Sequence, residues 1–317
     1  MKKILFLTCL FLTTLGFSAE NVLQRLTHLD GFSPNHKNRL RELRLLSKDF
    51  EALYPFEKSD VPIDILIPTI ESEIEMIPIT ITFARRNLLH PIRNIYLVAP
   101  ASPKIISMAQ QLDCIFVDEN TVLPIKLTDI FYFPSGCGGC DRRGWLFQQF
   151  LKLSCDEICE SEHVLVIDTD TLLIRPQTYT YKNYTLLQCS DEYHQPYRDV
   201  YKKLIGEEAK GPFSFVSHTT LFEKSKVKHF KQHIENLHRK PWFQAIMDLM
   251  DKNEPSAFSE HESYAQFVVS FYPDSFIQLY FFNNSLLSRR KHLAPFLSGK
   301  LQVDPYMKSI SFHYYRN

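Results

Sequence analysis

Short apolar segments alternate with helix-length segments from about residue 61 onward, and this alternation constrains the fold more than any other feature. Each apolar segment is rich in branched aliphatic residues, which is typical of a buried strand. Helical segments of ten or more residues between such strands indicate βαβ units. The expected strands are 63–68, 95–98, 114–117 and 163–167, and the expected helices are 73–89, 103–112 and 145–153. We therefore predict an α/β fold with a mostly parallel sheet flanked by helices.

The most apolar of these strands, 163–167, runs directly into Asp168-Thr169-Asp170. Residues i and i+2 of an extended chain project to the same side, so both carboxylates can approach one cation. In open α/β sheets, ligands bind beyond the carboxyl ends of the strands. Carboxylate oxygens suit Mg²⁺ or Mn²⁺, which keep other positions for water and substrate phosphate. We interpret Asp168 and Asp170 as metal ligands; the alternative is a pair of solvated acids at a turn.

The N-terminal residues differ in composition from the rest of the chain. Residues 1–18 combine two Lys, an apolar run and small residues at the end, which is the pattern of a secretory signal peptide. Because the apolar run is shorter than the ~20 residues of a membrane-spanning helix, cleavage and export through the secretory route are expected. An uncleaved membrane anchor is the alternative. No later segment reaches spanning length, so no stable transmembrane span is expected once the signal is removed.

Residues 19–58 and 59–317 are the remaining expected units. Leucines at helical spacing among Arg and Glu predict an N-terminal helical extension over 19–58. Residues 59–317 contain no repeat, low-complexity tract or Pro/Ser linker, so we expect them to form a single domain.

The charge balance argues against a nucleic-acid partner. The chain has 36 Lys and Arg against 36 Asp and Glu, whereas phosphate-backbone binders are usually strongly basic. The basic run 224–240 resembles such a patch when read alone. Its apolar residues, however, follow helical spacing and predict an amphipathic surface helix. These residues are Val227, Phe230, Ile234 and Leu237.

The cysteines allow three interpretations. Removal of a signal peptide would take Cys9 from the seven cysteines and leave an even number in an oxidising route, where disulfides are permitted. The pairs at 137/140 and 155/159 have the spacing of a four-thiolate zinc site, but they could equally form disulfides or stay free. Cys114 and Cys189 lie in apolar runs and are expected in the core.

Beyond the paired acids, the sequence resembles a known group of proteins. The run HVLVIDTDTLLIRP resembles the D-x-D region of GT-A glycosyltransferases. Further segments are similar, in order, to a bacterial glycosyltransferase-like family with this motif, and together they cover roughly residues 60–317. The matching segments are 63–81, 90–100, 141–153, 163–176, 258–268 and 309–316. The resemblance implies a GT-A-like, Rossmann-related domain and a metal-dependent glycosyltransferase that moves a sugar from a nucleotide-sugar donor to an unknown acceptor.

The resemblance also suggests roles for the residues that would hold the donor. Pro68, Thr69 and Glu71 correspond to the strand and loop that hold the nucleoside, although an ordinary strand-to-helix turn is equally compatible with them. Arg142 and Arg143 open a helix, and a helix N-terminus with adjacent Arg is a natural anion site for the diphosphate. The alternative is that both are solvated charges. Gln148, Gln149 and Lys152 continue the same helix and could present one face to the ligand.

The remaining candidates lie near the C-terminus. Glu260 and Glu262 precede an apolar helical run, and either could act as the general base near the acceptor; the alternative is a pair of acids favoured by the helix dipole. The resemblance implies that His313 completes the cation site, which would favour Mn²⁺ over Mg²⁺ because imidazole is a poorer ligand for Mg²⁺.

Two other classes of function are compatible with these residues. One is a nucleotidyltransferase or metal-dependent phosphate hydrolase on the same scaffold. The other is a non-catalytic secreted carbohydrate-binding protein. If the host is bacterial, export conflicts with the cytosolic supply of nucleotide sugars; either the protein acts in a foreign compartment, the N-terminal segment is an anchor, or the donor is of another kind.

Overall fold

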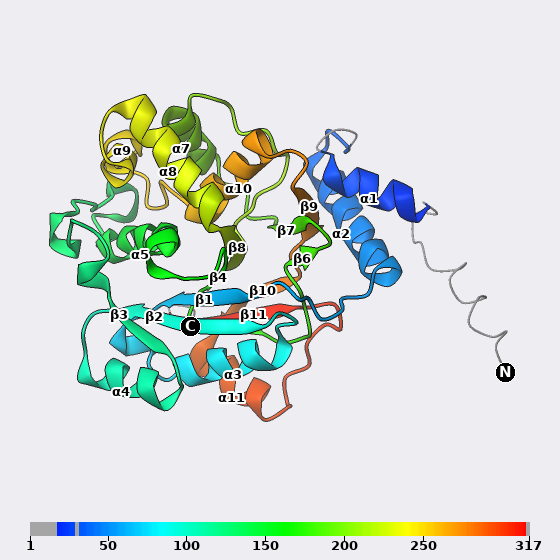
Figure 1. The fold of residues 1–317 in the computed structure, drawn as a ribbon, viewed down its shortest axis with the longest axis horizontal. Coiled ribbons are helices and arrows are strands. Elements are labelled where there is room, and N and C mark those ends of the chain that lie inside the picture. The colour runs from blue at the N-terminus through cyan, green and yellow to red at the C-terminus, as the bar shows by residue number, and fades with distance from the viewer. Residues whose placement is uncertain (1–17, 29–31, 315–317) are drawn as a thin grey trace.

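A five-stranded sheet lies at the centre of the computed structural model, which describes residues 18–28 and 32–314. Its strand order is β3-β2-β1-β4-β8 (Figure 1). The first four strands in this order are parallel, and β8 runs antiparallel to β4. The strands are β1 (Ile63–Pro68), β2 (Ile92–Ala99), β3 (Ile115–Asp118), β4 (His163–Ile167) and β8 (Thr219–Glu223). The predicted mixed α/β fold with a mostly parallel sheet is therefore confirmed.

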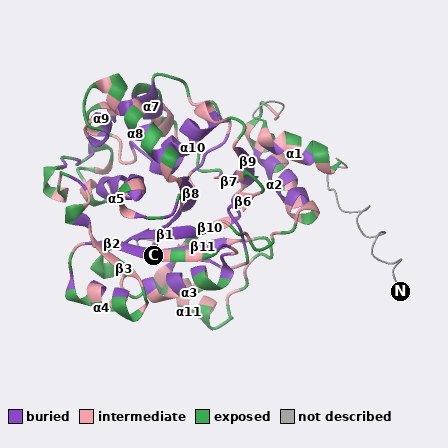
Figure 2. Cartoon of the chain, viewed as in Figure 1, coloured by how far each residue is buried: buried purple, intermediate pink, exposed green. Residues whose placement is uncertain are grey.

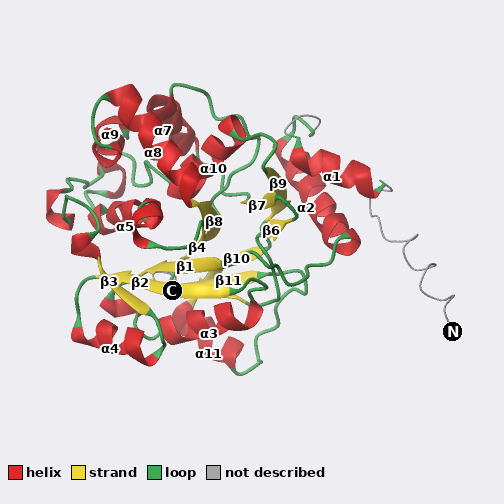
Figure 3. Cartoon of the chain, viewed as in Figure 1, coloured by secondary structure: helices red, strands yellow, loops and turns green. Residues whose placement is uncertain are grey.

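Helices cover both faces of this sheet, as Figures 1 and 3 show. Side chains alternate along a strand, so Ile63, Ile65 and Ile67 of β1 pack with α3, whereas Leu66 packs with α5 on the opposite face. The helices on the α3 side are α3 (Ile77–Asn87), α4 (Pro103–Gln111) and α11 (Arg289–Leu297). Those on the α5 side are α5 (Arg143–Leu153), α7 (Gln195–Ile205), α8 (Lys224–His238), α9 (Trp242–Leu249) and α10 (Glu260–Phe271).

The central strands are buried and the outer strand β3 is not (Figure 2). All six residues of β1 are buried, in keeping with a strand covered on both faces. As the edge strand, β3 exposes Ile115, and Cys114 just before it is only half-buried. The expectation that Cys114 lies in the core was therefore wrong, while Cys189 is buried as expected.

Two smaller three-stranded sheets extend the domain. One has the order β10-β11-β5 and the other β6-β7-β9. In the first, β11 pairs antiparallel with β5, which directly follows the two acids; this pairing carries the C-terminal strand to the end of β4. The strands are β5 (Thr171–Leu173), β6 (Thr180–Tyr181), β7 (Tyr184–Cys189), β9 (Phe276–Tyr280), β10 (Asn283–Ser288) and β11 (Ser309–His313).

The N-terminal segment forms α1 (Ala19–Thr27) and α2 (His36–Leu53). Val22, Leu43 and Phe50 of these helices belong to the same hydrophobic cluster as the α5 face of the sheet. The Oγ of Ser47 accepts a hydrogen bond of 2.8 Å from the backbone N–H of Tyr280 in β9. Residues 1–17 of the expected signal peptide lie outside the described residues. No helix in the described part of the chain is long and apolar enough to cross a membrane.

Short helices and the cysteines complete the structure. The 3-10 helices are η1 (Glu71–Glu73), η2 (Glu119–Thr121), η3 (Leu127–Asp129) and η4 (Ser135–Cys137), and α6 (Cys155–Ile158) is a single α-helical turn. Cys137 forms a disulfide with Cys140, so the four-thiolate zinc interpretation was wrong. Cys155 and Cys159 are buried free thiols.

Residues 224–238 of the basic run form α8. The helical spacing of its apolar residues reflects the face that packs on the core. Val227, Phe230 and Ile234 are fully buried, as predicted. Leu237 is 51% exposed, so the expected apolar stripe stops one turn earlier than its spacing suggested. Lys231, on the same helix, is buried because it pairs with Asp156 and Glu157 of α6.

Candidate active site

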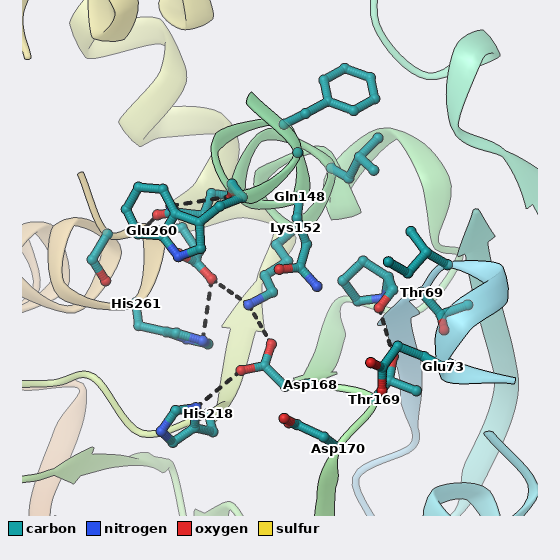
Figure 4. Close-up of a pocket in the computed structure, with 18 of the residues that line it drawn as sticks. Thr69, Glu73, Gln148, Lys152, Asp168, Thr169, Asp170, His218, Glu260 and His261 are labelled. Atoms are coloured by element: carbon teal, nitrogen blue, oxygen red, sulfur yellow. Dashed lines mark hydrogen bonds and ion pairs between the residues drawn. The ribbon is translucent and has the colours of Figure 1, made fainter. Parts of the chain in front are cut away.

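A cleft of about 680 Å³ opens at the carboxyl ends of the parallel strands. It is lined by residues that follow β1, β2, β3 and β4, together with residues of α5, α10 and β11. Several charged side chains converge at its β4 end (Figure 4). The candidates from the sequence that line it are Pro68, Thr69, Arg142, Gln148, Gln149, Lys152, Asp168, Asp170, Glu260 and His313.

Asp168 lies directly after β4 and contacts two cationic groups. Its Oδ1 atom is 2.6 Å from Lys152 Nζ, and its Oδ2 atom is 3.1 Å from His218 Nδ1. Burial raises the pKa of this carboxyl, but the charges of Lys152 and His218 outweigh burial and hold the pKa well below its usual range. Asp168 is therefore ionised at any physiological pH.

Lys152 connects Asp168 to Glu260. Its side chain is only 4% exposed, and its Nζ atom lies 2.6 Å from an oxygen of each carboxylate. Burial favours the neutral amine, but the two carboxylates outweigh it and raise the pKa of Lys152 above its usual range. The side chain is therefore a fixed positive charge in the wall of the cleft. The sequence predicted Lys152 on a helix face presented to the ligand, but not its pairing with the two carboxylates.

His218 and Glu192 extend this network, and sequence reasoning missed both. His218 Nε2 lies 3.6 Å from Glu192 Oε1. Burial lowers the pKa of His218, yet the carboxylates of Asp168 and Glu192 raise it overall, to about 10. Both residues lie in loops with no recognisable motif, so only the fold brings them to the end of β4.

Asp170 meets the C-terminal strand. Its Oδ2 atom lies 2.9 Å from His313 Nδ1, and its backbone carbonyl accepts a hydrogen bond of 2.8 Å from Phe312 N. The ring of His313 is 5.6 Å, centroid to centroid, from that of His218. The C-terminal histidine expected at the metal site thus lies against the second acid of the motif.

Asp168, Asp170 and His313 are the candidate donors for a divalent cation. Two carboxylates and an imidazole suit Mn²⁺ chemically, and Asp170 and His313 are close enough to approach one ion. Within residues 18–28 and 32–314, however, no group of three or more His, Cys, Asp or Glu side chains is already arranged around a common point. Asp170 and His313 are close enough to hold one cation once their direct contact opens, while Asp168 would share its carboxylate between the ion and Lys152.

Glu260 and Glu262 open α10 but have different surroundings. Glu260 lines the cleft, and although burial raises its pKa, Lys152 lowers it overall. The carboxylate of Glu262 lies outside the cleft lining and accepts hydrogen bonds from Phe215 N at 2.7 Å and Gln266 Nε2 at 3.0 Å. The structure thus corrects the expectation for Glu262, whose carboxylate is occupied in holding neighbouring backbone and side chains.

His261, between these two acids, is a further cleft residue that the sequence did not single out. Its Nδ1 atom lies 2.7 Å from Thr220 Oγ1. Burial lowers its pKa to about 4, so the ring is neutral at physiological pH. Its Nε2 atom has no hydrogen bond to any described residue, although it lies 3.2 Å from Glu260 Oε1.

Two of the predicted donor contacts do not line the cleft. Glu71 pairs instead with Lys104 Nζ at 2.5 Å, and this hydrogen bond lowers the pKa of its carboxyl. Arg143 pairs with Asp141 at 2.8 Å. Both expectations are corrected, because each side chain is occupied by a neighbour at the surface.

Arg142 and Trp145 form the α5 rim of the cleft. The Arg142 guanidinium lies 4.2 Å from the centroid of the Trp145 ring, and its Nε donates a hydrogen bond of 2.8 Å to the carbonyl of Pro255. Gln148 lies one turn further along the helix and also lines the cleft. This rim combines a fixed positive charge with an aromatic surface, a combination suited to a polar, anionic ligand that carries a sugar.

Comparisons with known proteins found similarity only at the level of structure. No family model and no curated protein matches the chain. The galactosyltransferase LgtC, solved with donor and acceptor sugar analogues, is 15% identical with a TM-score of 0.41, over 78% of this chain and 86% of that one. Mouse xyloside xylosyltransferase 1 is 13% identical with a TM-score of 0.41, over 81% and 99%. The glycosyltransferase GlyE of Streptococcus pneumoniae TIGR4 is 12% identical with a TM-score of 0.41, over 81% and 55%. Similarity of this size leaves the function to be inferred from the side chains of the cleft.

Proposed function

We propose that this protein is a metal-dependent glycosyltransferase that moves a sugar from a nucleoside-diphosphate donor to an acceptor. The main observation behind the proposal is the contact of 2.9 Å between Asp170 Oδ2 and His313 Nδ1. This pair lies beside the ionised Asp168 at the end of a buried parallel strand. This group lies at the carboxyl edge of the sheet, which is where open α/β folds bind their ligands.

Asp170 and His313, with a share of Asp168, would hold Mn²⁺ or Mg²⁺. An imidazole in the set favours Mn²⁺. The bound ion would supply charge neutralisation for the diphosphate as it leaves the sugar.

The protein's own cations support the same leaving group. Lys152 keeps its charge despite burial because two carboxylates flank it, and it lies at the wall nearest Asp168. Arg142 lies at the rim and donates from a planar group suited to phosphate oxygens. Both are held in position before the donor binds. This lowers the free energy of reorganisation as negative charge develops on the leaving diphosphate.

Glu260 is the acid that we assign to the acceptor side of the site. It lines the cleft, whereas Glu262 does not, and the low pKa of Glu260 keeps it ionised. An ionised carboxylate beside the acceptor hydroxyl could accept its proton, and its hydrogen bond to Lys152 orients it.

The test is a donor screen on the full chain. Nucleoside-diphosphate sugars are incubated with the protein and Mn²⁺, and release of nucleoside diphosphate is followed with and without simple sugar acceptors. Wild type should release it from at least one donor, Asp170→Ala should not, and Asp274→Ala, an exposed acid at a distant turn, should match wild type. Absence of both release and nucleoside-diphosphate binding in the wild type would overturn the proposal.

A further inference from the structure

The end of the cleft beyond β3 contains a carboxyl group with no protein partner. Glu119 directly follows β3 in η2, lines the cleft and is only 9% exposed. No hydrogen bond or ion pair joins its carboxyl to any residue that the structure describes, whereas the neighbouring Asp118 accepts from Asn120 N at 3.0 Å. Burial, and secondarily the charge of Asp118, raises the pKa of Glu119 to about 7. A largely buried carboxyl that lines the cleft and has no protein donor is suited to a ligand that supplies one.

A second polar group in the same cleft also lacks a partner. Thr69 follows β1 and is 5% exposed, and its Oγ1 atom makes no hydrogen bond within the described residues. Buried hydroxyls are normally hydrogen-bonded, so a second polar side chain of the cleft lining is left unsatisfied by the protein. Thr69 directly follows β1 and Glu119 directly follows β3, and these two strands lie on either side of β2 in the sheet.

The sheet order sets the distance between this end and the acids. In the order β3-β2-β1-β4, Glu119 is three strand positions from Asp168, or roughly 14 Å at the usual strand spacing. This distance is comparable to the span of an extended nucleoside diphosphate. A donor whose diphosphate lies at Asp170 would therefore carry its base to Glu119.

The lining of the cleft also contains apolar surface that suits a flat base. Ile70, Pro100 and Leu127 line the cleft after β1, after β2 and in η3. Ile70 is 51% exposed although it is a large aliphatic residue, so its surface is available to the face of a ring. Apolar surfaces with one or two polar groups at the edge are typical of small-ligand sites.

We propose that Glu119 binds the base of the donor through hydrogen bonds and that this base is guanine. The donor is then a guanosine-diphosphate sugar. This inference rests on the proposed function. In its ionised form, which the carboxyl takes above its pKa of about 7, Glu119 offers only acceptors, and guanine presents two adjacent N–H donors on its pairing edge. Uracil offers one N–H between two carbonyl oxygens, which would face the carboxylate oxygens. Adenine offers its amino group beside a ring acceptor. Of these three bases, only guanine offers a donor to each oxygen of the ionised carboxylate, and its two N–H groups would favour that ionised form.

Calorimetric titration with GDP, UDP and ADP in the presence of Mn²⁺ tests this directly. Wild type should bind GDP at least ~10-fold more tightly than the other two, as expected for a two-bond reading of one base. Glu119→Gln replaces one acceptor by a donor and should lose most of the GDP affinity while UDP binding changes little. Asp118→Asn, the matched control next in the chain, should keep the preference for GDP.

The outcomes separate this inference from the proposed function. A wild-type preference for UDP or ADP, or an equal loss of all three nucleotides in Glu119→Gln, overturns the guanine assignment and leaves the glycosyltransferase proposal standing. If none of the three binds, both are overturned. A melting curve for each variant distinguishes lost recognition from lost folding.

Discussion

The Nζ atom of Lys152 lies 2.6 Å from Asp168 Oδ1, although the two residues come from different elements and the lysine is almost fully buried. The same ammonium group lies 2.6 Å from Glu260. One buried cation therefore fixes the first acid of the motif and the acid proposed for the acceptor side. The stability of the domain and the geometry of the site depend on the same side chain.

Lys152→Met should destabilise the protein. It leaves the buried carboxylate of Glu260 and the partly buried one of Asp168 without their cation, and breaking a buried pair costs about 3–5 kcal/mol. Urea unfolding measures the loss. Adding Glu260→Gln to Lys152→Met should recover part of it, because one of the two uncompensated charges is then removed. Equal unfolding free energies for Lys152→Met and the wild type would show that the pair contributes nothing.

Glu260 and Glu262 should respond oppositely to substitution. Glu262→Ala leaves Phe215 N–H without its acceptor and should cost about 1–3 kcal/mol of stability, with kcat preserved in the folded fraction. Glu260→Gln should lower kcat, because it removes the carboxylate that lines the cleft. Steady-state kinetics beside thermal melts separate the two effects. A large fall in kcat for Glu262→Ala alone would reverse the assignment.

Glu119 should make stability depend on pH. Its pKa is raised from 4.5 to about 7, so the unfolded chain releases this proton at lower pH than the folded protein does. The penalty is absent below the unfolded pKa, grows as pH rises toward 7 and is constant above it. Glu119→Gln should therefore raise Tm at about pH 8 and much less at about pH 5. The same Tm change at both pH values would contradict a desolvated carboxyl.

His313→Ala should change the metal preference. Loss of the imidazole leaves an all-oxygen donor set, so affinity for Mn²⁺ should fall by roughly 10–100-fold while that for Mg²⁺ changes less. Competition titrations with the two ions measure the ratio. His292→Ala, on α11 outside the cleft lining, is a matched control and should leave the ratio unchanged. An unaltered Mn²⁺ to Mg²⁺ ratio in His313→Ala would remove this residue from the metal site.

The central sheet could be predicted from the sequence because its strands are short aliphatic runs that end at polar residues. Asp168 and Asp170 could be located for the same reason, since they follow the most apolar of these runs. The two acids of α10 could not be distinguished. Residues i and i+2 of a helix point in different directions, and the strand pattern that pairs Asp168 with Asp170 does not apply to them.

Other parts of the site depend on long-range packing. His218 meets Asp168 because β8 pairs with β4, and Glu119 reaches the cleft because it follows the carboxyl end of β3, which is parallel to β2. Neither residue carries a local motif. Glu71 and Arg143 were misjudged because each finds a partner within the surface, which spacing along the chain does not reveal.

The most direct test of the central claim is a crystal structure of the protein soaked with Mn²⁺ and GDP, with anomalous data collected for manganese. The proposed function predicts a manganese peak within bonding distance of Asp170 and His313, with the diphosphate bound to it and Lys152 still paired with Asp168. A manganese or diphosphate site away from Asp170 and His313 would contradict it.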